Sequence, residues 1–157
     1  MKLSDLINEK AIIPELGSTD RNGVIRELVQ ALVDQGVIPP EHLETIARAA
    51  IARENQGSTG FGKGVAVPHV KHECLKKMEA TIGRSSHGVD FAALDRAPVY
   101  TVVMLLSPAS APEGHLAAME RVFRYLQREN FRRFLRQADS REAIIGLIQE
   151  ADDAQNE

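Results

Sequence analysis

The residue with the clearest chemical potential is His69, which follows a glycine-rich stretch and a short apolar segment. Residues 55–64 read NQGSTGFGKG, with four glycines, and residues 65–68 connect them to the histidine. Imidazole has a reference pKa of about 6.5, so a large neutral fraction exists at neutral pH and a ring nitrogen can attack phosphorus without an added base. Successive backbone N–H groups of a glycine loop can form a concavity that binds anions. This combination favours phosphoryl transfer through His69.

The same glycines allow two other interpretations. Gly57 and the Gly62-Lys63 pair match the start of the nucleotide-binding pattern GxxxxGK[ST]. Gly64, however, stands where the magnesium-binding hydroxyl belongs, and the loop is expected to follow a helix and precede a strand, the reverse of the P-loop order. A flexible connector is the default interpretation of a glycine cluster. Direct attachment to the segment ending in His69 favours a role beside the histidine instead.

A metal site is a further possibility, because imidazole and thiolate are zinc ligands. His69, His72 and Cys74 are closely spaced, and His87 or His115 could complete a tetrahedral set. The spacing matches no familiar zinc pattern, and the chain contains a single cysteine. We therefore expect neither a metal ion nor another cofactor.

The composition excludes several classes of function. The 157 residues fit one domain, and a single cysteine excludes an intrachain disulfide and favours a reducing cytoplasm. The net charge of −3 gives no general attraction to nucleic acid. Acidic residues interrupt the N-terminal segment, unlike in a signal peptide, and the longest apolar run, 102–106, is far shorter than the roughly 20 residues of a membrane span. We expect a cytoplasmic protein without nucleic-acid binding or membrane insertion.

Helical spacing of apolar residues predicts the elements that must position His69. Capping residues at 17–20 open the first helix, proline opens the second, and Asp139 with Glu142 suggests a capping box before the last. We expect the domain to span residues 1–150 and the tail, 151–157, to be frayed. The helices are expected over residues 21–36, 40–54, 116–126, 131–135 and from 139 onward.

Short apolar segments predict the strands. They are expected at 65–67, 80–85 and 99–106, and the last is an uninterrupted apolar run, as is typical of a central strand. Residues 55–64 are expected to form a loop. The order of helices, strands and helices predicts an α/β or α+β class, a single-domain sandwich of helices around a mixed β-sheet.

The segment around His69 also resembles a family signature. Residues 53–54 (RE) and 58–69 (STGFGKGVAVPH) are similar to the active-site pattern of the IIA components of the sugar phosphotransferase system, fructose/mannitol type, also called PTS IIA type 2. The resemblance continues with residues 113–116 (EGHL) at a helix start and covers nearly the whole chain. The greatest resemblance is to the stand-alone nitrogen-regulatory IIA proteins.

The resemblance implies roles for individual residues. His69 would accept a phosphoryl group from the carrier protein HPr or from its nitrogen-branch counterpart. His115 would be the second active-site histidine, and Arg53 would help to hold the phosphoryl group. The chain would then be a phosphotransferase component that needs no cofactor. The loop around the phosphoryl site would contribute Ser58, Thr59, Gly60, Gly62 and Gly64.

Two functions remain open under this resemblance. The phosphate could pass to a sugar-specific IIB for fructose- or mannitol-type uptake. Alternatively, the chain could be a regulatory binding module whose partners distinguish phosphorylated from unphosphorylated His69. The sequence shows no fused transport domain, which favours the regulatory role.

Three features keep simpler interpretations. Arg53 could be a surface cation at a helix C-terminus, and His115 could be solvated at a helix start. The six arginines between residues 121 and 136 could form a solvated face or a docking surface for an acidic partner. Val70 follows His69 where the family more often has a small residue, which bears on the choice of partner.

Overall fold

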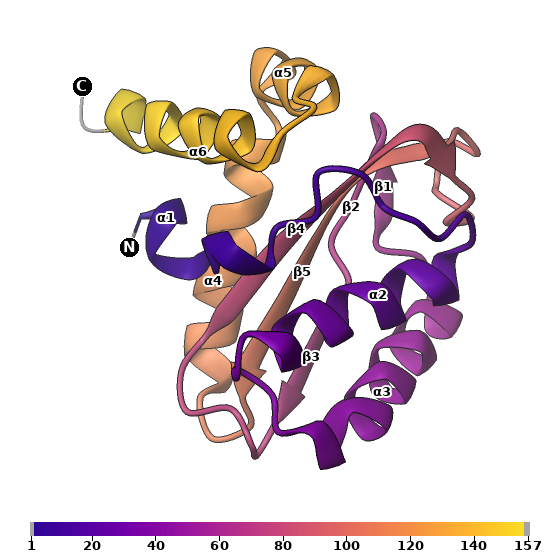
Figure 1. The fold of residues 1–157 in the computed structure, drawn as a ribbon, viewed down its shortest axis with the longest axis vertical. Helices are drawn as coiled ribbons and strands as arrows, with labels where there is room; N and C mark the ends of the chain where they lie inside the picture. Colours follow the sequence, from indigo (N-terminus) through magenta and orange to yellow (C-terminus); the bar gives the residue numbers. More distant parts are fainter. Residues whose placement is uncertain (1, 156–157) are drawn as a thin grey trace.

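Helices surround a five-stranded sheet in the part of the chain that the computed structural model describes, residues 2–155 (Figure 1). Short 3-10 turns at Glu9–Ala11 and Pro40–His42 precede the second and third helices. The helices are α1 (Leu3–Leu6), α2 (Arg21–Asp34), α3 (Leu43–Gln56), α4 (Pro112–Leu126), α5 (Glu129–Gln137) and α6 (Arg141–Gln155). The strands are β1 (Gly60–Gly62), β2 (Val65–Ala66), β3 (His69–His72), β4 (Glu79–Val89) and β5 (Val99–Pro108).

β5 is the central strand of the sheet. β4 pairs with it antiparallel, whereas β2 and β3 both pair with it parallel. Val65 lies opposite Thr101 and His69 lies opposite Leu105, so β2 and β3 share one register and form a single strand interrupted around Pro68. Proline has no N–H for the ladder, although the Pro68 carbonyl still accepts the N–H of Leu105 at 3.0 Å. The predicted central strand, the mixed sheet and the α/β class are confirmed.

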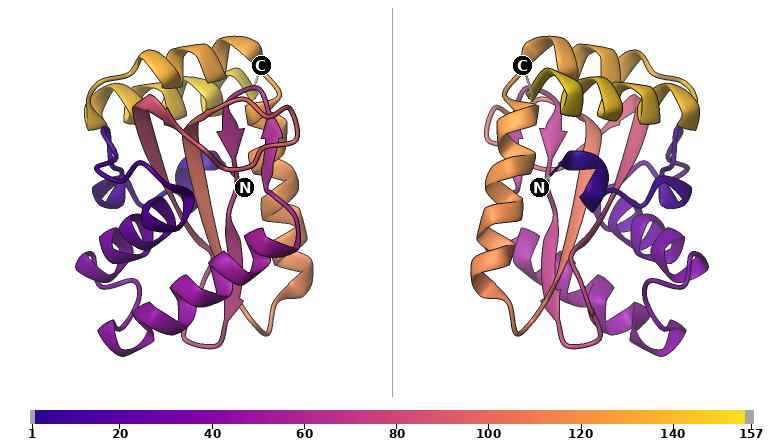
Figure 2. Two further views of the ribbon diagram at one scale, coloured as in Figure 1. Left: turned by 90° about the vertical axis from the view of Figure 1, so that its right-hand side faces the viewer. Right: turned by 90° about the vertical axis from the view of Figure 1, so that its left-hand side faces the viewer.

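Alternate residues of β5 face two separate apolar layers, as the period of a strand requires. Val103 and Leu105 belong to the layer built with α1, α4, α5 and α6. Val102, Met104 and Leu106 belong to the layer built with α2 and α3. Figure 2 shows the sheet between α4 on one side and α2 and α3 on the other, with α5 and α6 across one end. The predicted sandwich of helices around a sheet is confirmed.

The first long helices begin and end as their sequence indicates. The Asp20 carboxylate accepts the N–H of Gly23 at 2.7 Å and so caps α2. The chain turns away after α2 through Gly36, whose φ of 75° favours glycine. Pro40 opens the 3-10 turn that leads into α3. Both helices bury their apolar stripes against the same face of the sheet.

Two strands and one cap differ from the sequence predictions. β3, with sequence HVKH, was not predicted because an edge strand needs no continuous apolar run. β1 lies inside the expected loop, where Gly60 pairs with Ala66. The predicted capping box at Asp139 is wrong, because the Ser140 hydroxyl accepts the N–H of Ala143 at 3.1 Å and caps α6 instead.

The C-terminal helix continues past the point where fraying was expected. The prediction of a frayed tail over 151–157 is wrong for residues 151–155, which complete α6; residues 156–157 lie outside the described residues. The side chain of Asp152 is only 4% exposed. Its carboxylate accepts the N–H groups of Leu3 at 2.8 Å and Ser4 at 3.1 Å and the hydroxyl of Tyr125 at 3.2 Å. These bonds tie α6 to α1 and α4.

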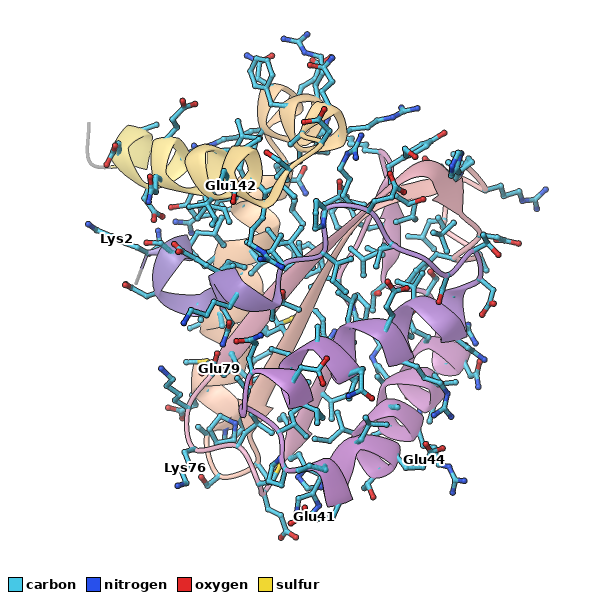
Figure 3. All side chains as sticks on the ribbon, in the orientation of Figure 1. Lys2, Glu41, Glu44, Lys76, Glu79 and Glu142 are labelled. Atoms are coloured by element: carbon cyan, nitrogen blue, oxygen red, sulfur yellow. The ribbon has the colours of Figure 1, made fainter. Side chains whose placement is uncertain are left out.

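Charged side chains lie at the periphery, as Figure 3 shows for Glu41, Glu44 and Lys76. Glu44 pairs with Arg26 at 2.7 Å and with Arg48 at 3.1 Å. Such exposed ion pairs contribute little to stability, so the two apolar layers must hold the fold together. No helix in the described part of the chain is long and apolar enough to cross a membrane.

We predict that Asp152→Asn lowers the free energy of unfolding by about 1.5–3 kcal/mol, because hydrogen bonds to a charged group are lost. Burial acts to raise the pKa of Asp152, but the hydrogen bonds from Ser4, Leu3 and Tyr125 outweigh it and hold the pKa below 3.8. The contribution is therefore complete above the unfolded value and is lost as pH falls through the folded pKa. Urea unfolding at several pH values measures it.

The matched control is Asp153→Asn, which changes the neighbouring exposed carboxylate. Equal stability losses in the two variants would show that Asp152 does not tie the termini together.

Candidate functional site

His69 lies in a hollow at the edge of the sheet. The hollow has a volume of about 660 Å³ and opens between α3, β3 and α4. Within residues 2–155, β3 pairs only with β5, so its other side is open to side chains from both helical layers. We call this cavity the His69 hollow. It is lined by Ala49, Arg53, His69, Val70, Lys71, His115, Leu116, Met119, Glu120 and Phe123.

Three elements bring the predicted site residues together. His69 is the first residue of β3, Arg53 lies in the last turn of α3, and His115 lies in the first turn of α4. Because α3 and α4 belong to opposite helical layers, the hollow forms where both layers reach the open edge of β3. The structure therefore places the three residues in one hollow, although 62 positions separate Arg53 from His115 in the sequence.

The ring of His69 is fixed by its own strand. Its Nδ1 lies 2.9 Å from the carbonyl oxygen of Val67. A carbonyl can only accept a hydrogen bond, so Nδ1 carries the proton and donates it. In the neutral ring, Nε2 then carries a lone pair. Nε2 is therefore the ring nitrogen available for nucleophilic attack.

His115 is buried beside this ring. It is only 5% exposed, and its ring centre lies 5.4 Å from that of His69. Its Nδ1 lies 2.7 Å from the hydroxyl oxygen of Ser107, near the end of β5. When the Ser107 hydroxyl donates to Nδ1, Nε2 of His115 carries the hydrogen and becomes a donor. The possibility that His115 is solvated at the helix start is excluded by its burial.

Both histidines favour the neutral state. Burial is the largest effect on His69 and lowers its pKa below 6.5; the hydrogen bond to Val67 opposes this, and the charges of Arg53 and Lys71 add to it. Burial also lowers the pKa of His115 below 6.5, with smaller contributions from His69 and Lys71. A neutral His69 is the form that can attack phosphorus.

Arg53 and Glu54 connect the hollow to the glycine loop. The Arg53 guanidinium donates to the carbonyl of Gly57 at 2.8 Å and has further N–H groups available for an anion. Glu54 is only 3% exposed, and its carboxylate accepts the N–H of Thr59 at 3.0 Å and also the Thr59 hydroxyl. The beginning of the loop is thus held by two consecutive residues of α3.

Comparison with known proteins assigns the family. Residues 5–151 match the family described as "Phosphoenolpyruvate-dependent sugar phosphotransferase system, EIIA 2". The chain belongs to this family. It is 34% identical over 152 residues to the "PTS system fructose-specific EIIABC component" of Bacillus subtilis, a match that covers 97% of this chain and 24% of that protein. The chain therefore spans about a quarter of that relative's length.

Other relatives of this EIIA chain are of similar size. It is 35% identical over 118 residues to a "Nitrogen regulatory protein" of Pseudomonas aeruginosa, covering 75% of this chain and 77% of the relative. The crystal structure of "Nitrogen Regulatory Protein IIA-Ntr from Neisseria meningitidis" superposes with a TM-score of 0.83 at 24% identity, covering 93% of this chain and 98% of that one. The superposition shows that the folds agree.

In this EIIA chain the loop residues expected at the phosphoryl site do not line the His69 hollow as the described residues define it. The hydroxyl of Ser58 donates to the carbonyl of Phe91 at 2.7 Å and accepts the N–H of Gly60 at 2.9 Å. Gly62 and Gly64 have φ values of 106° and 78°, which favour glycine. Direct contact of these five residues with a phosphoryl group stays a prediction. They are Ser58, Thr59, Gly60, Gly62 and Gly64.

Of the other histidines considered as metal ligands, His115 lies beside His69 but His72 does not. His72 lies three positions further along β3, so its side chain points to the opposite face. Its Nδ1 accepts the N–H of Cys74 at 3.0 Å, and its ring centre lies 5.1 Å from that of His42. In residues 2–155, no group of three or more His, Cys, Asp or Glu side chains could hold a metal ion.

Several contributors to the site were not identified from the sequence. Ser107 follows the apolar run of β5, and nothing local in the sequence indicated its bond to His115. Leu116 and Phe123 lie in the helix predicted over residues 116–126, and their place at the site was not identified. Both line the hollow, and Leu116 is 66% exposed. Val70, whose size was expected to affect partners, is 7% exposed and packs mainly against the α2–α3 layer.

We predict that His69 titrates with a midpoint below 6.5 and that its neutral ring carries the proton on Nδ1, because burial and the Val67 carbonyl favour this form. Since folding lowers the pKa, the contribution of His69 to stability is lost as pH falls from about 6.5 through the folded value. Two-dimensional 15N NMR of the imidazole rings measures both properties. The same titration in urea supplies the pKa of His69 in the unfolded state. A folded-state midpoint above that reference, or a proton on Nε2, would contradict the assignment.

Proposed function

We propose that this chain is a phosphocarrier in which Nε2 of His69 accepts a phosphoryl group from the phosphohistidine of HPr or of an HPr-like protein of the nitrogen branch. The observation that carries the proposal is the contact of His69 Nδ1 with the Val67 carbonyl, which leaves Nε2 available in a hollow shared with Arg53 and His115. Membership of the EIIA type 2 family supports the same chemistry.

The transfer is a direct exchange between two imidazoles. The lone pair of His69 Nε2 forms a new N–P bond while the N–P bond of the donor phosphohistidine breaks, and that electron pair returns to the donor ring. Nδ1–H stays bound to the Val67 carbonyl, which stabilises the positive charge that develops on the His69 ring. Such a transfer depends on alignment and on charge stabilisation more than on covalent machinery, so this chain needs no nucleotide or metal of its own.

Arg53 and His115 supply the charge stabilisation. The N–H groups of Arg53 that do not bind Gly57 can donate to phosphoryl oxygens, and a guanidinium suits bidentate phosphate binding. His115 donates from Nε2 when Ser107 donates to its Nδ1. A phosphoryl group also attracts a proton to the neighbouring ring, so His115 becomes a stronger donor once the group has arrived. The glycine loop acts by holding Arg53 through Gly57.

The rim of the His69 hollow fits a protein better than a small metabolite as the phosphoryl donor. Leu116, Met119 and Phe123 line it from successive turns of α4, and Leu116 is 66% exposed. An exposed apolar side chain beside a nucleophile is typical of a surface that is covered by a partner. Lys71 and Glu120 add charges of both signs at the same rim.

The destination of the phosphoryl group has two candidates, each supported by relatives. The fructose-specific relative supports transfer to a IIB acceptor, and the nitrogen regulatory relatives support the binding of regulatory targets. Both roles place the protein in the cytoplasm. Mixing the phosphorylated chain with a purified IIB and following loss of label from His69 distinguishes them, because a purely regulatory protein keeps its phosphoryl group.

We predict that purified enzyme I, HPr and phosphoenolpyruvate add one phosphoryl group to the chain, on Nε2 of His69, and that the bond is labile in acid as a phosphoramidate is. Mass spectrometry and 31P NMR at neutral and alkaline pH measure the amount and the position. His69→Ala should abolish labelling, whereas His72→Ala, the control on the opposite face of β3, should leave it intact. Acid-stable phosphate, or labelling of His69→Ala, would refute the proposal.

We predict that Arg53→Ala and His115→Ala fold normally but accept the phosphoryl group about 10- to 100-fold more slowly, since a hydrogen bond to a charged group contributes about 1.5–3 kcal/mol. Rapid-quench measurements with phosphorylated HPr give the rate. Arg48→Ala is the control, because Arg48 lies on α3 in an exposed ion pair outside the hollow. A rate equal to that of the parent in His115→Ala would remove His115 from the site.

A further inference from the structure

A second hollow lies beside the pairing of β2 with β5, at the opposite end of β5 from His69. It has a volume of about 320 Å³ and opens between the glycine loop, the segment before β5 and α5. We call it the Tyr100 hollow. Thr101 lines it, whereas Leu105 lies opposite His69. Thr101 and Leu105 are about 13 Å apart along β5, at roughly 3.3 Å per strand residue. A ligand in the Tyr100 hollow would therefore leave His69 accessible.

Three cationic side chains from two segments line this hollow. Lys63 comes from the glycine loop, and Arg132 and Arg136 come from α5. The guanidinium carbon of Arg136 lies 3.5 Å from the centre of the Tyr100 ring, a cation–π contact that restrains it. Arg132 donates to the carbonyl of Leu126 at 2.8 Å and has further N–H groups available.

These cations lack a negative partner in the protein. Among residues 2–155, no carboxylate forms an ion pair with Lys63, Arg132 or Arg136. Asp95 is the acid that lines the hollow, but its oxygens accept the N–H groups of Ala97 at 3.0 Å and Lys63 at 3.1 Å. Those bonds lower the pKa of Asp95 below 3.8 and keep it charged. Three positive charges therefore face one negative charge, and like charges that converge in this way indicate an anion site.

The backbone conformation at Lys63 is unusual for a residue with a side chain. Lys63 has a φ of 62°, between Gly62 at 106° and Gly64 at 78°. Glycine adopts this region without strain, whereas a residue with a Cβ does not. A lysine at this position is less favourable than a glycine would be, and its side chain lines the hollow.

We propose that the Tyr100 hollow binds a small phosphorylated molecule. Guanidinium groups match the geometry of phosphate oxygens, and Lys63 adds a mobile ammonium group. A volume of about 320 Å³ fits the lower end of the usual range for small-molecule sites, about 300–1,000 Å³. Val65, Pro98 and Tyr100 supply apolar contacts for the rest of the molecule. The proposal is independent of phosphoryl transfer at His69.

The test is an NMR titration of the 15N-labelled, unphosphorylated chain with pyrophosphate, at ionic strength held constant with sodium chloride. We expect saturable shifts of the amides at residues 63–65 and 100–101 and of the Nε–H signals of Arg132 and Arg136. Arg136→Gln and Lys63→Gly should each weaken binding about tenfold or more. Arg133→Gln is the matched control, since Arg133 is exposed on the same helix but does not line the hollow.

Several outcomes of the titration would overturn the proposal. They are equal weakening by Arg133→Gln, unsaturable shifts spread over all basic residues, and shifts centred on Arg53 and His69. Binding of poly-glutamate without binding of pyrophosphate would also overturn it and would point to an acidic protein as partner. Arg136→Gln should accept phosphate on His69 at the parent rate, so loss of pyrophosphate binding with intact phosphoryl transfer separates this proposal from the phosphocarrier function.

Discussion

The hydrogen bond from His69 Nδ1 to the Val67 carbonyl determines which ring nitrogen can react. It forms where the strand that pairs with β5 is interrupted around Pro68 and then resumes in the same register. At this interruption Val67 keeps a carbonyl that the ladder does not use, and the following histidine turns its ring back onto it. The central strand, the break and the nucleophile are therefore one structural unit, and a shift in register would move the reactive nitrogen.

The position of this unit at a sheet edge explains how two helical layers cooperate in one site. A strand inside a sheet has neighbours on both sides, whereas β3 pairs with β5 on one side. Arg53 reaches the open side from the α2–α3 layer and His115 reaches it from the α4 layer. Neither helix alone could hold an anion between a cation and a second imidazole, so the sandwich architecture is a requirement of the site.

Much of this arrangement follows from the sequence, but its tertiary part does not. The apolar run of β5 and the periodic stripes of α2, α3 and α4 predict the layers, because burial depends on local pattern. β3 could not be predicted, since a polar edge strand is recognisable only from its pairing with β5. The bond between Ser107 and His115 joins two elements and leaves no local signature. The tail was predicted wrongly because the buried bonds of Asp152 connect it to residues nearly the whole chain away.

The charge of the His69 hollow links the proposed phosphoryl transfer to recognition by partner proteins. In the unphosphorylated chain, Arg53 and Lys71 lie beside two neutral histidines, with Glu120 as the acid in the lining. Under the proposed function, a phosphoryl group adds nearly two negative charges and reverses the balance at a rim where Leu116 is exposed. A partner that covers this rim would exclude water from it. Electrostatic differences are larger in such a poorly hydrated contact than in open solvent. In the proposed function, a partner with a nucleophile removes the group, and a partner without one can only distinguish the two charge states, so the His69 hollow would support relay and regulation by the same physical means.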